Sequence, residues 1–337
     1  MKISDFNPMV SIIVLNYNGK QYLKDCFESL ERIEYNNYEI VLVDNASLDG
    51  SIESTNSNFP KIKVISLDRN YGFAEGNNKG AEKANGKYIV FLNNDTRVDK
   101  NWLSELINAI KIYGEDCIYS SKILFYDRPQ ILNTIGGVIT PIGGGFDIGF
   151  SEMDTKEFNK VRYIGSPSGC SMLLKKSLFQ QMGGFDKDYF AYFEDIDFGW
   201  RCWLFGYKTY YVPTSVVYHE FGGTAGPRNS TFRIFYGQKN RLANMVKNFS
   251  IERLIVGFGI SILFDILRIS VFLINGRFDS ILAVLKGNYY FIKELPKTLK
   301  KRKVIQANRK LSDAEMSIMG LIAPLSVCIQ EYRRIEG

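Results

Sequence analysis

Short apolar runs alternate with stretches of helical periodicity over the first half of the chain. Residues 10–15 and 88–92 are apolar at nearly every position and too short for a helix, which is typical of strands buried on both faces. Residues 39–43 and 62–65 predict two more strands, and residues 21–30 carry apolar side chains at helical spacing. Alternating strands and helices imply right-handed crossovers. We therefore expect an α/β fold with a mostly parallel sheet flanked by helices and extended by one or two antiparallel strands.

Three of the predicted strands end abruptly in polar residues. Ligands in open α/β sheets bind beyond the carboxyl ends of the strands, so chemistry is expected at Asn16-Tyr17-Asn18, Asp44-Asn45 and Asn93-Asn94-Asp95. An aromatic ring such as Tyr17 can stack on a base, and a carboxylate such as Asp44 can accept a hydrogen bond from a pyrimidine imide N–H. The two together suit uracil or thymine. The alternative is that Asp44 only caps the next helix.

A glycine-rich segment lies between the third and fourth predicted strands. Gly72, Gly76 and Gly80 recur every fourth residue, unlike the G-x-G-x-x-G spacing of a dinucleotide fold. On a helix this spacing leaves one face without side chains, which permits close approach to the sheet or to a ligand. Both interpretations are open. Under the second, Asn70, Gly72 and Asn77 line a donor pocket.

Asp95 and His219 are the candidate metal ligands. Carboxylate oxygens select hard cations such as Mg²⁺ or Mn²⁺, which complete their shell with water and substrate phosphates, so one firm carboxylate can suffice. Asp95 can equally cap a turn. His219 is the only histidine and closes the predicted strand 215–219 before a flexible glycine segment. It can be a neutral imidazole ligand near Asp95, or it can be structural.

Residues 194–204 form a predicted helix with a cluster of carboxylates at its start. The apolar side chains at positions 196, 200, 203 and 204 share one helical face, and Asp195 points away from it. A carboxylate aimed into a cleft can deprotonate an acceptor hydroxyl, so Asp195 is the predicted general base, with Glu194 beside it. The alternative is that Glu194, Asp195 and Asp197 are an acidic first turn that complements the helix dipole. Asp197 is also placed to pair with Arg201 at i,i+4.

Composition and charge narrow the setting. The five cysteines include no C-x-x-C pair, which argues against a disulfide framework or a zinc site and favours a reducing, cytoplasmic environment. The first residues show no basic segment followed by an apolar run, so no signal peptide is expected there. The net charge is +6, and residues 228–310 hold 17 Lys and Arg against four Asp and Glu. The excess positive charge therefore lies in the C-terminal third.

The C-terminal third also contains an apolar stretch, residues 254–274, of the length that spans a bilayer. Asp265 and Arg268 lie inside it, and each charge near a bilayer centre costs about 3 kcal/mol. Lys and Arg flank this stretch and a second one, residues 281–295, so both flanks are expected to stay on the cytoplasmic side. We expect a helix lying in the membrane interface, or a re-entrant hairpin, that binds anionic lipid. The alternative is a buried core helix with a solvated basic tail.

Seven motifs together resemble those of family 2 glycosyltransferases, and most closely the rhamnosyltransferase-like members that build bacterial and archaeal surface glycans. In chain order they are Val10-Ser-Ile-Ile-Val-Leu-Asn-Tyr-Asn-Gly19, Val43-Asp-Asn-Ala-Ser47, Asn70-Tyr-Gly-Phe-Ala-Glu-Gly-Asn-Asn78, Phe91-Leu-Asn-Asn-Asp-Thr96, Gly183-Gly-Phe-Asp186, Tyr192-Phe-Glu-Asp-Ile-Asp197 and Val217-Tyr-His219. The resemblance implies a GT-A fold, a nucleotide-diphosphate sugar donor, a divalent cation and an inverting transfer.

The resemblance also implies roles by position. Asp195 would be the base, Asp95 would end the metal-binding D-x-D motif, and His219 would be a second contributor at the metal or the diphosphate. Tyr17 and Asp44 would hold the nucleobase, and the donor would also meet Asn18, Asn45, Asn70, Gly72, Asn77 and Asn94. The chain departs from the pattern at the first carboxylate of the D-x-D motif, which is Asn93 here.

The expected enzyme moves a sugar from a UDP- or dTDP-sugar to a hydroxyl of a glycan or polyprenyl-linked acceptor, at the cytoplasmic face of the cell membrane and without a nucleic-acid partner. Residues 1–245 are the expected GT-A domain, with a nucleotide-binding half (1–98) and an acceptor and catalytic half (99–245). Residues 246–337 are the expected helical, basic, membrane-associating extension. Two alternatives stay open: a sugar-phosphate nucleotidyltransferase, which would normally carry a basic phosphate loop near the first strand, and a catalytically silent glycan-binding or scaffold protein.

Overall fold

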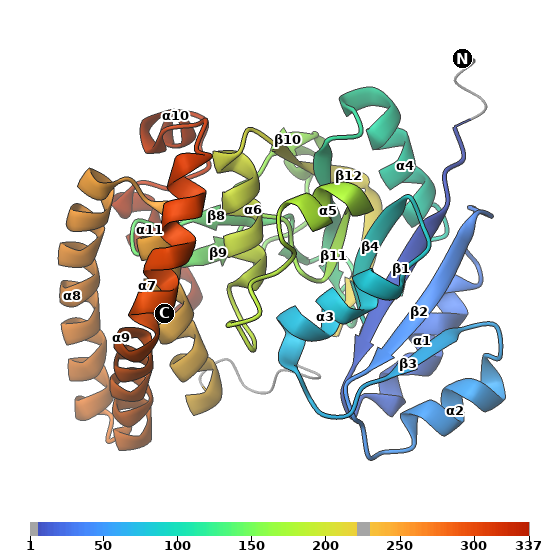
Figure 1. Ribbon diagram of the computed structural model, residues 1–337, viewed down its shortest axis with the longest axis horizontal. Helices are drawn as coiled ribbons and strands as arrows, with labels where there is room; N and C mark the ends of the chain where they lie inside the picture. Colours follow the sequence, from blue (N-terminus) through green and yellow to red (C-terminus); the bar gives the residue numbers. More distant parts are fainter. Residues whose placement is uncertain (1–5, 221–229, 337) are drawn as a thin grey trace.

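The computed structural model describes residues 6–220 and 230–336. Its centre is a ten-stranded sheet in the order β10-β12-β6-β11-β4-β1-β2-β3, with β5 beside β12 and β7 beside β6 (Figure 1). The strands are β1 (Val10–Asn16), β2 (Tyr38–Asp44), β3 (Lys63–Ser66), β4 (Tyr88–Asn93), β5 (Thr96–Val98), β6 (Cys117–Phe125), β7 (Leu132–Thr134), β10 (Arg162–Tyr163), β11 (Ser171–Lys175) and β12 (Lys208–His219). A separate pair consists of β8 (Gly137–Ile139) and β9 (Gly145–Asp147).

The predicted α/β class is confirmed, and the four strands expected in the first half of the chain pair in parallel with one another. β1 pairs in parallel with both β2 and β4, and β2 pairs in parallel with β3. We expected one or two antiparallel strands, but β5, β7, β10 and β11 all pair in this way. These strands are two to five residues long. Strands this short carry too few alternating positions for a reliable periodicity.

Helices cover both faces of the sheet (Figure 1). They are α1 (Lys20–Leu30), α2 (Ser51–Asn58), α3 (Gly72–Lys83), α4 (Trp102–Tyr113), α5 (Lys176–Gln181), α6 (Glu194–Leu204), α7 (Thr231–Asn248), α8 (Ile251–Ile274), α9 (Phe278–Ala307), α10 (Asp313–Ile318) and α11 (Leu325–Glu336). Ile12 and Val14 of β1 face the core layer of α1 and α4, whereas Ile13 faces the layer of α3 and α6. Burial on both faces explains the unbroken apolar run.

The helices of the C-terminal third pack beside α6, on the side of the molecule away from β3 (Figure 1). Met245 and Phe249, from α7 and its C-cap, are buried in the same core as Trp200 of α6, and the rings of Trp200 and Phe249 meet at 4.5 Å between centroids. Phe291 of α9 joins that core. The expected boundary between residues 245 and 246 falls within α7, and the division into domains stays a prediction.

Candidate active site

The ends of β1, β2 and β4 are joined by a buried network of amides and one carboxylate. Asn16 pairs in register with Asp44, and its Nδ2 donates to Asp44 Oδ1 at 3.1 Å. Asn94 Nδ2 donates in turn to Asn16 Oδ1 at 2.7 Å. The second oxygen of Asp44 accepts from the backbone N–H of Ser47 at 2.8 Å. The sequence analysis placed Asn16 at a strand end but gave it no role of its own, because that role appears only once the three strands are aligned.

Tyr17 and Asn18 lie at the surface beside this network. Asn18 has a φ of +51°, a left-handed conformation that asparagine tolerates better than most residues. Its Oδ1 accepts from the N–H of Leu48, and its own N–H donates to Ser47 Oγ, each at 2.8 Å. These bonds tie the loop after β1 to the loop after β2. Tyr17 is 42% exposed and therefore accessible to a base.

Asn45 and Asn70 build the turn that leads into α3. Asn45 Nδ2 donates to Asn70 Oδ1 at 2.9 Å and to the carbonyl of Gly72 at 3.0 Å. Asn45 Oδ1 accepts from the N–H of Tyr71 at 2.9 Å. Asn77 is buried, and its Nδ2 donates to the carbonyl of Phe73 in its own helix. In the structure these amides fix the path of the backbone, and their contact with a donor stays a prediction.

The glycines of α3 permit close approach, which was one of the two interpretations of their spacing. A Cβ at Gly76 would lie 2.6 Å from Leu15 Cδ1, and a Cβ at Gly80 would lie 2.7 Å from Ile13 Cγ2. Close packing on the sheet therefore explains these two. Gly72 has a φ of +76°, and a Cβ there would lie 2.2 Å from the carbonyl oxygen of Phe190. Only glycine lets the start of α3 meet the loop before α6.

Asp95 and His219 come together, as their positions at strand ends suggested. β12 pairs with β5 so that His219 lies opposite Thr96, and His219 Nε2 is 3.2 Å from Asp95 Oδ1. The other ring nitrogen, Nδ1, contacts Asn133 Oδ1 at 2.9 Å. Asn133, on β7, was missed by the sequence analysis. It fixes the ring so that Nε2 faces the carboxylate.

The Asp95–His219 pair fits a divalent cation. A carboxylate oxygen and an imidazole nitrogen at this separation can share one ion, and both donors suit Mn²⁺. Among the described residues no group of three or more His, Cys, Asp or Glu side chains is arranged as a metal site. Asp95 and His219 would supply two ligands to the cation, and the remaining coordination positions would be open to water and phosphate oxygens.

Asp195 sits at the start of α6 against the loop that precedes β11. Its Oδ2 accepts from the N–H of Gly169 at 3.0 Å, and its Oδ1 accepts from the N–H of Ile196 at 2.7 Å. β11 begins beside the end of β4, since the N–H of Asn93 donates to the carbonyl of Cys170 at 3.0 Å. Gly169 and Cys170, in the loop before β11, therefore connect Asp195 to the sheet edge that carries Asp95.

Burial gives Asp195 the ionisation properties of a base. Loss of hydration and, to a smaller extent, the charge of Asp147 together raise its pKa to about 6, against the two backbone hydrogen bonds that lower the pKa. Asp147 closes β9 and was missed by the sequence analysis, because this short hairpin has no periodic pattern. Burial also raises the pKa of the Cys170 thiol, with added contributions from Asp95 and Asp147. The charge of Asp147 thus acts on both Asp195 and Cys170, the first residue before β11.

Glu194 behaves differently from its neighbour. Burial, and then the charge of Asp195, raises the pKa of Glu194 well above its ordinary value. Its Oε2 has no hydrogen-bond partner among the residues that the structure describes. The raised pKa favours the neutral form of this side chain, which suits donation of a hydrogen bond. Its predicted catalytic role stays a prediction.

The segment that presents Asp195 is strained and held in place by α7. Tyr192 and Phe193, immediately before α6, have φ values of +68° and +67°, which cost energy for aromatic residues. Asn240 of α7 donates from Nδ2 to the carbonyls of Ala191 and Tyr192, at 2.9 and 2.7 Å. This clamp shows that the C-terminal helices help to position the candidate base.

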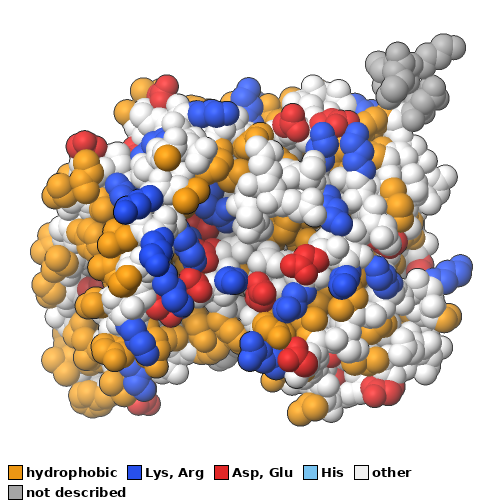
Figure 2. Space-filling model, viewed as in Figure 1, with side chains coloured by type: hydrophobic (Ala, Val, Ile, Leu, Met, Phe, Trp, Pro, Cys, Tyr) orange, Lys and Arg blue, Asp and Glu red, His pale blue; other side chains and the backbone are white. Residues whose placement is uncertain are grey.

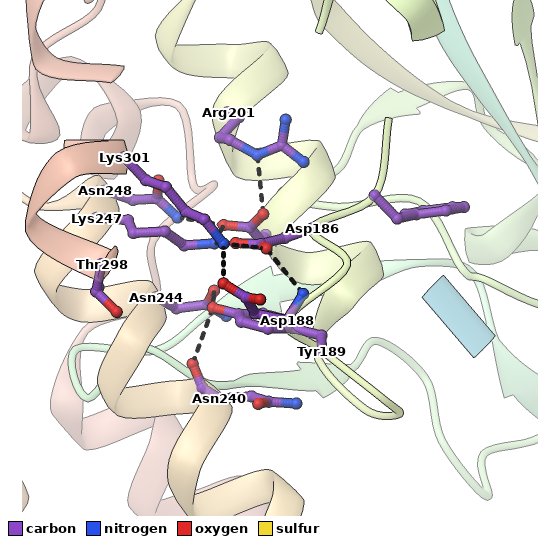
Figure 3. A network of polar contacts seen from close by, with 12 residues as sticks. Asp186, Asp188, Tyr189, Arg201, Asn240, Asn244, Lys247, Asn248, Thr298 and Lys301 are labelled. Carbon is purple, nitrogen blue, oxygen red and sulfur yellow. Dashed lines mark hydrogen bonds and ion pairs between the residues drawn. The ribbon is translucent and has the colours of Figure 1, made fainter. Parts of the chain in front are cut away.

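A buried ion network fastens α6 to α7 and α9 (Figure 3). Asp197 lies 2.8 Å from Arg201 Nε, the predicted i,i+4 pair, and 2.7 Å from Lys247 Nζ. Lys247 also contacts Asp186 at 2.7 Å, and Lys301 contacts both Asp186 and Asp188. Burial raises the pKa of Asp197, but Lys247 and Arg201 outweigh it and hold the pKa below its ordinary value. Asp197 is therefore a structural carboxylate.

Comparison with known proteins identifies the class. The family model "Glycosyl transferase family 2" matches residues 11–181, slightly more than half of the 337 residues. The chain therefore belongs to glycosyl transferase family 2. Asp195 and His219 lie beyond the matched residues.

Several curated relatives are named as glycosyltransferases. The chain is 30% identical over 106 residues to the putative teichuronic acid biosynthesis glycosyltransferase TuaG of Bacillus subtilis, covering 31% of this chain and 42% of that one. It is 22% identical over 239 residues to the N-acetylglucosaminyl-diphospho-decaprenol L-rhamnosyltransferase of Mycobacterium tuberculosis, covering 65% and 78%. The chain spans only 25% of a third relative, the uncharacterized protein y4gI of Sinorhizobium fredii.

Solved structures confirm the GT-A fold. GalNAc-T7, crystallised with UDP, GalNAc and Mn²⁺, superposes with a TM-score of 0.61 at 18% identity, covering 74% of this chain and 49% of that one. The mannosyltransferase PcManGT of Pyrobaculum calidifontis, in complex with GDP-Man and Mn²⁺, gives 0.51 at 16% identity, covering 94% and 80%. At these identities the likeness concerns the fold alone.

Proposed function

We propose that this family 2 glycosyltransferase transfers a sugar, with inversion, from a UDP- or dTDP-sugar to a hydroxyl of a glycan or polyprenyl-linked acceptor. The observation that carries the proposal is Asp195, a desolvated carboxylate with a pKa of about 6 beside the sheet edge of the Asp95–His219 pair. A base poised near neutral pH on one side and a cation-binding pair on the other are what a single displacement requires.

The nucleotide is expected at the ends of β1 and β2. Tyr17 is exposed and available to stack on a base. Asp44 is buried at the end of the neighbouring strand, where it accepts hydrogen bonds from Asn16 and Ser47. Each carboxylate oxygen that already accepts one hydrogen bond can accept another. Neighbouring folds that bind UDP and GDP-Man support a nucleotide-sugar donor, and the preference for a pyrimidine rests on Tyr17 and Asp44.

The chemical step uses groups of this chain on opposite sides of the sugar. Asp195 accepts the proton of the acceptor hydroxyl as that oxygen attacks the anomeric carbon, and the bond to the nucleoside diphosphate breaks. Asp95 and His219 would hold Mg²⁺ or Mn²⁺, which when bound neutralises the charge that develops on the leaving diphosphate. No covalent sugar intermediate is needed, because the acceptor oxygen attacks the anomeric carbon directly in a single displacement.

The pH dependence of transfer should report Asp195. The base acts only when ionised, so kcat/KM is expected to fall about tenfold per pH unit below about pH 6, the pKa to which burial raises Asp195. The effect on stability has the opposite direction. Because the folded pKa lies above the unfolded one, ionising Asp195 costs stability as the pH rises from about 4 to 6. Initial rates and urea titrations over this range measure the two trends. A rate that stays constant down to pH 4 would contradict the assignment.

Donor binding should be visible as thermal stabilisation. A ligand that binds only the native state at about 100 times its Kd stabilises it by about 2.7 kcal/mol. We expect UDP- or dTDP-sugars to raise Tm more with Mn²⁺ than without it. Asp95→Asn, which keeps the side-chain shape, should lose the Mn²⁺-dependent part of the shift. Asp127→Asn, a change at an exposed carboxylate, serves as the matched control. Failure of every nucleotide to give a metal-dependent shift in the wild type would favour a scaffold protein instead.

A further inference from the structure

The outer face of α8 is apolar along its whole length. Between Arg253 and the turn that ends α8, the exposed positions recur at helical spacing and carry only apolar or small side chains. They are Ile255, Val256, Gly259, Ile262, Leu263, Ile266, Leu267, Ser270, Val271, Leu273 and Ile274. Among the described residues, α8 is the one helix long and apolar enough to cross a membrane. Only 17% of its most apolar window is buried, unlike a core helix.

The two charges within α8 face the protein. Asp265 Oδ1 lies 2.6 Å from Arg241 Nη2, and Asp265 Oδ2 accepts from Gln238 Nε2 at 2.7 Å. Arg268 donates to Gln238, and Arg241 donates to Ser261 Oγ. α7 therefore contacts both charges of α8 on the protein side of that helix. The charges that disfavour a membrane-spanning α8 are compatible with an α8 that lies flat.

α9 extends this face and adds a row of cations. Its exposed apolar side chains follow helical spacing: Phe278, Leu282, Leu285, Tyr289, Ile292 and Leu299. Lys286, Lys293 and Lys300 each follow one of these residues directly, so they stand about 100° further round the helix, where Lys297 joins them. Figure 2 shows Lys and Arg side chains over the region of α9, beside the hydrophobic surface of the C-terminal helices. We name the four lysines the lysine ridge.

We propose that the α8–α9 face docks on an anionic bilayer, with α8 lying in the boundary between headgroups and acyl chains and the lysine ridge on the headgroups. An uncharged apolar face flanked by lysines fits such a surface. A second copy of the chain fits less well. The exposed acidic side chains on α8 and α9 are Glu252 and Asp279 at the helix starts, so a dimer through this face would leave the ridge without counter-charges.

This inference does not depend on the proposed transfer. Docking would, however, explain why α7 and α9 are fastened to the segment that presents Asp195. A polyprenyl-linked acceptor reaches the enzyme from the membrane. The helices that contact the lipid would then also hold the candidate base.

Vesicle flotation of the full chain, without donor, tests the proposal. We expect the wild type to float with phosphatidylcholine vesicles that contain phosphatidylglycerol at low salt, to float poorly with phosphatidylcholine alone, and to be released by high salt. Lys293→Glu/Lys297→Glu/Lys300→Glu should lower the partition coefficient at least about 100-fold, since each lysine near an anionic surface contributes about fivefold. Leu263→Glu/Leu267→Glu should lower it as strongly. The control variant Lys61→Glu/Lys83→Glu/Lys111→Glu has the same change in net charge, at exposed sites elsewhere. Its partition coefficient should stay within a few-fold of the wild-type value.

Three outcomes would overturn the proposal. Equal flotation of the wild type and the ridge variant would show that the lysines bind no lipid. Resistance to high salt and to alkaline carbonate would show a spanning helix. No flotation of the wild type, together with a dimer in sedimentation velocity that Leu263→Glu/Leu267→Glu dissociates, would show a protein interface. All the substituted side chains are exposed, so unchanged thermal unfolding of each variant confirms that it folds.

Discussion

Asp195→Asn is expected to lower kcat for sugar transfer by about 10²–10⁴-fold while leaving the protein folded and able to bind donor, because removal of a general base costs rates of this size. Folding should survive for a physical reason. Asparagine keeps one of the two acceptor positions that face the N–H groups of Gly169 and Ile196. It also removes a buried charge whose cost is seen in the raised pKa of Asp195. The stability lost with one hydrogen bond is therefore offset by the stability gained when the buried charge is removed.

Single-turnover transfer and donor-induced thermal shift, measured side by side, separate catalysis from binding. Asp116→Asn is the matched control, since this carboxylate is 74% exposed and forms a long ion pair with Lys175, at 3.8 Å. It should transfer at the wild-type rate. Transfer by Asp195→Asn within a few-fold of wild type would remove Asp195 from the mechanism. Loss of donor binding in the same variant would mean that its role is structural.

Lys247→Met is expected to destabilise the protein by roughly 3–5 kcal/mol, since breaking a buried ion pair leaves uncompensated charge. The side chain of Lys247 is 1% exposed and contacts both Asp186 and Asp197. Burial raises the pKa of Asp186, yet Lys247 and Lys301 hold that pKa well below its ordinary value. The destabilisation should shrink as the pH falls, because protonation of these carboxylates removes the charge that Lys247 neutralises.

Urea unfolding at neutral and acidic pH measures this effect. Lys301→Met is the matched control. Lys301 is in the same network, but its side chain is 34% exposed, so water compensates its loss and we expect a cost of about 1 kcal/mol. Equal destabilisation by the two substitutions would show that the network does not depend on the buried lysine. A cost for Lys247→Met that is independent of pH would indicate lost packing instead.

The parts of the fold that could be predicted are those in which one strand or helix carries its own signal. The unbroken apolar runs of β1 and β4 and the helical spacing within α6 depend on local burial, so they were evident in the sequence. β7, β9 and β10 were not, because two or three residues show no periodicity. The length and apolar character of α8 were evident in the sequence. The burial of Asp265 against the protein was not, because it depends on a hydrogen bond from Arg241, 24 residues away.

The candidate site divides in the same way. Asp95, Asp195 and His219 stood out because each ends a strand or begins a helix. The groups that give them their properties did not. Asn133 orients His219 from β7, and Asp147 raises the pKa of Asp195 from β9. Lys247 neutralises Asp197 from a distance of 50 residues in sequence. Such partners are set by the register and packing of distant elements, which one sequence does not display.

The most direct test of the central claim is mass spectrometry of the products formed from UDP-, dTDP- and GDP-sugars with a polyprenyl-diphosphate-linked acceptor, run in parallel with wild type and Asp195→Asn. We predict an acceptor extended by one sugar from a pyrimidine-nucleotide donor, with one nucleoside diphosphate released per transfer, in the wild type only. A product of equal yield from Asp195→Asn would contradict the account. So would a wild type that binds a nucleotide sugar yet forms no glycosylated product and releases no nucleoside diphosphate with any donor in the panel.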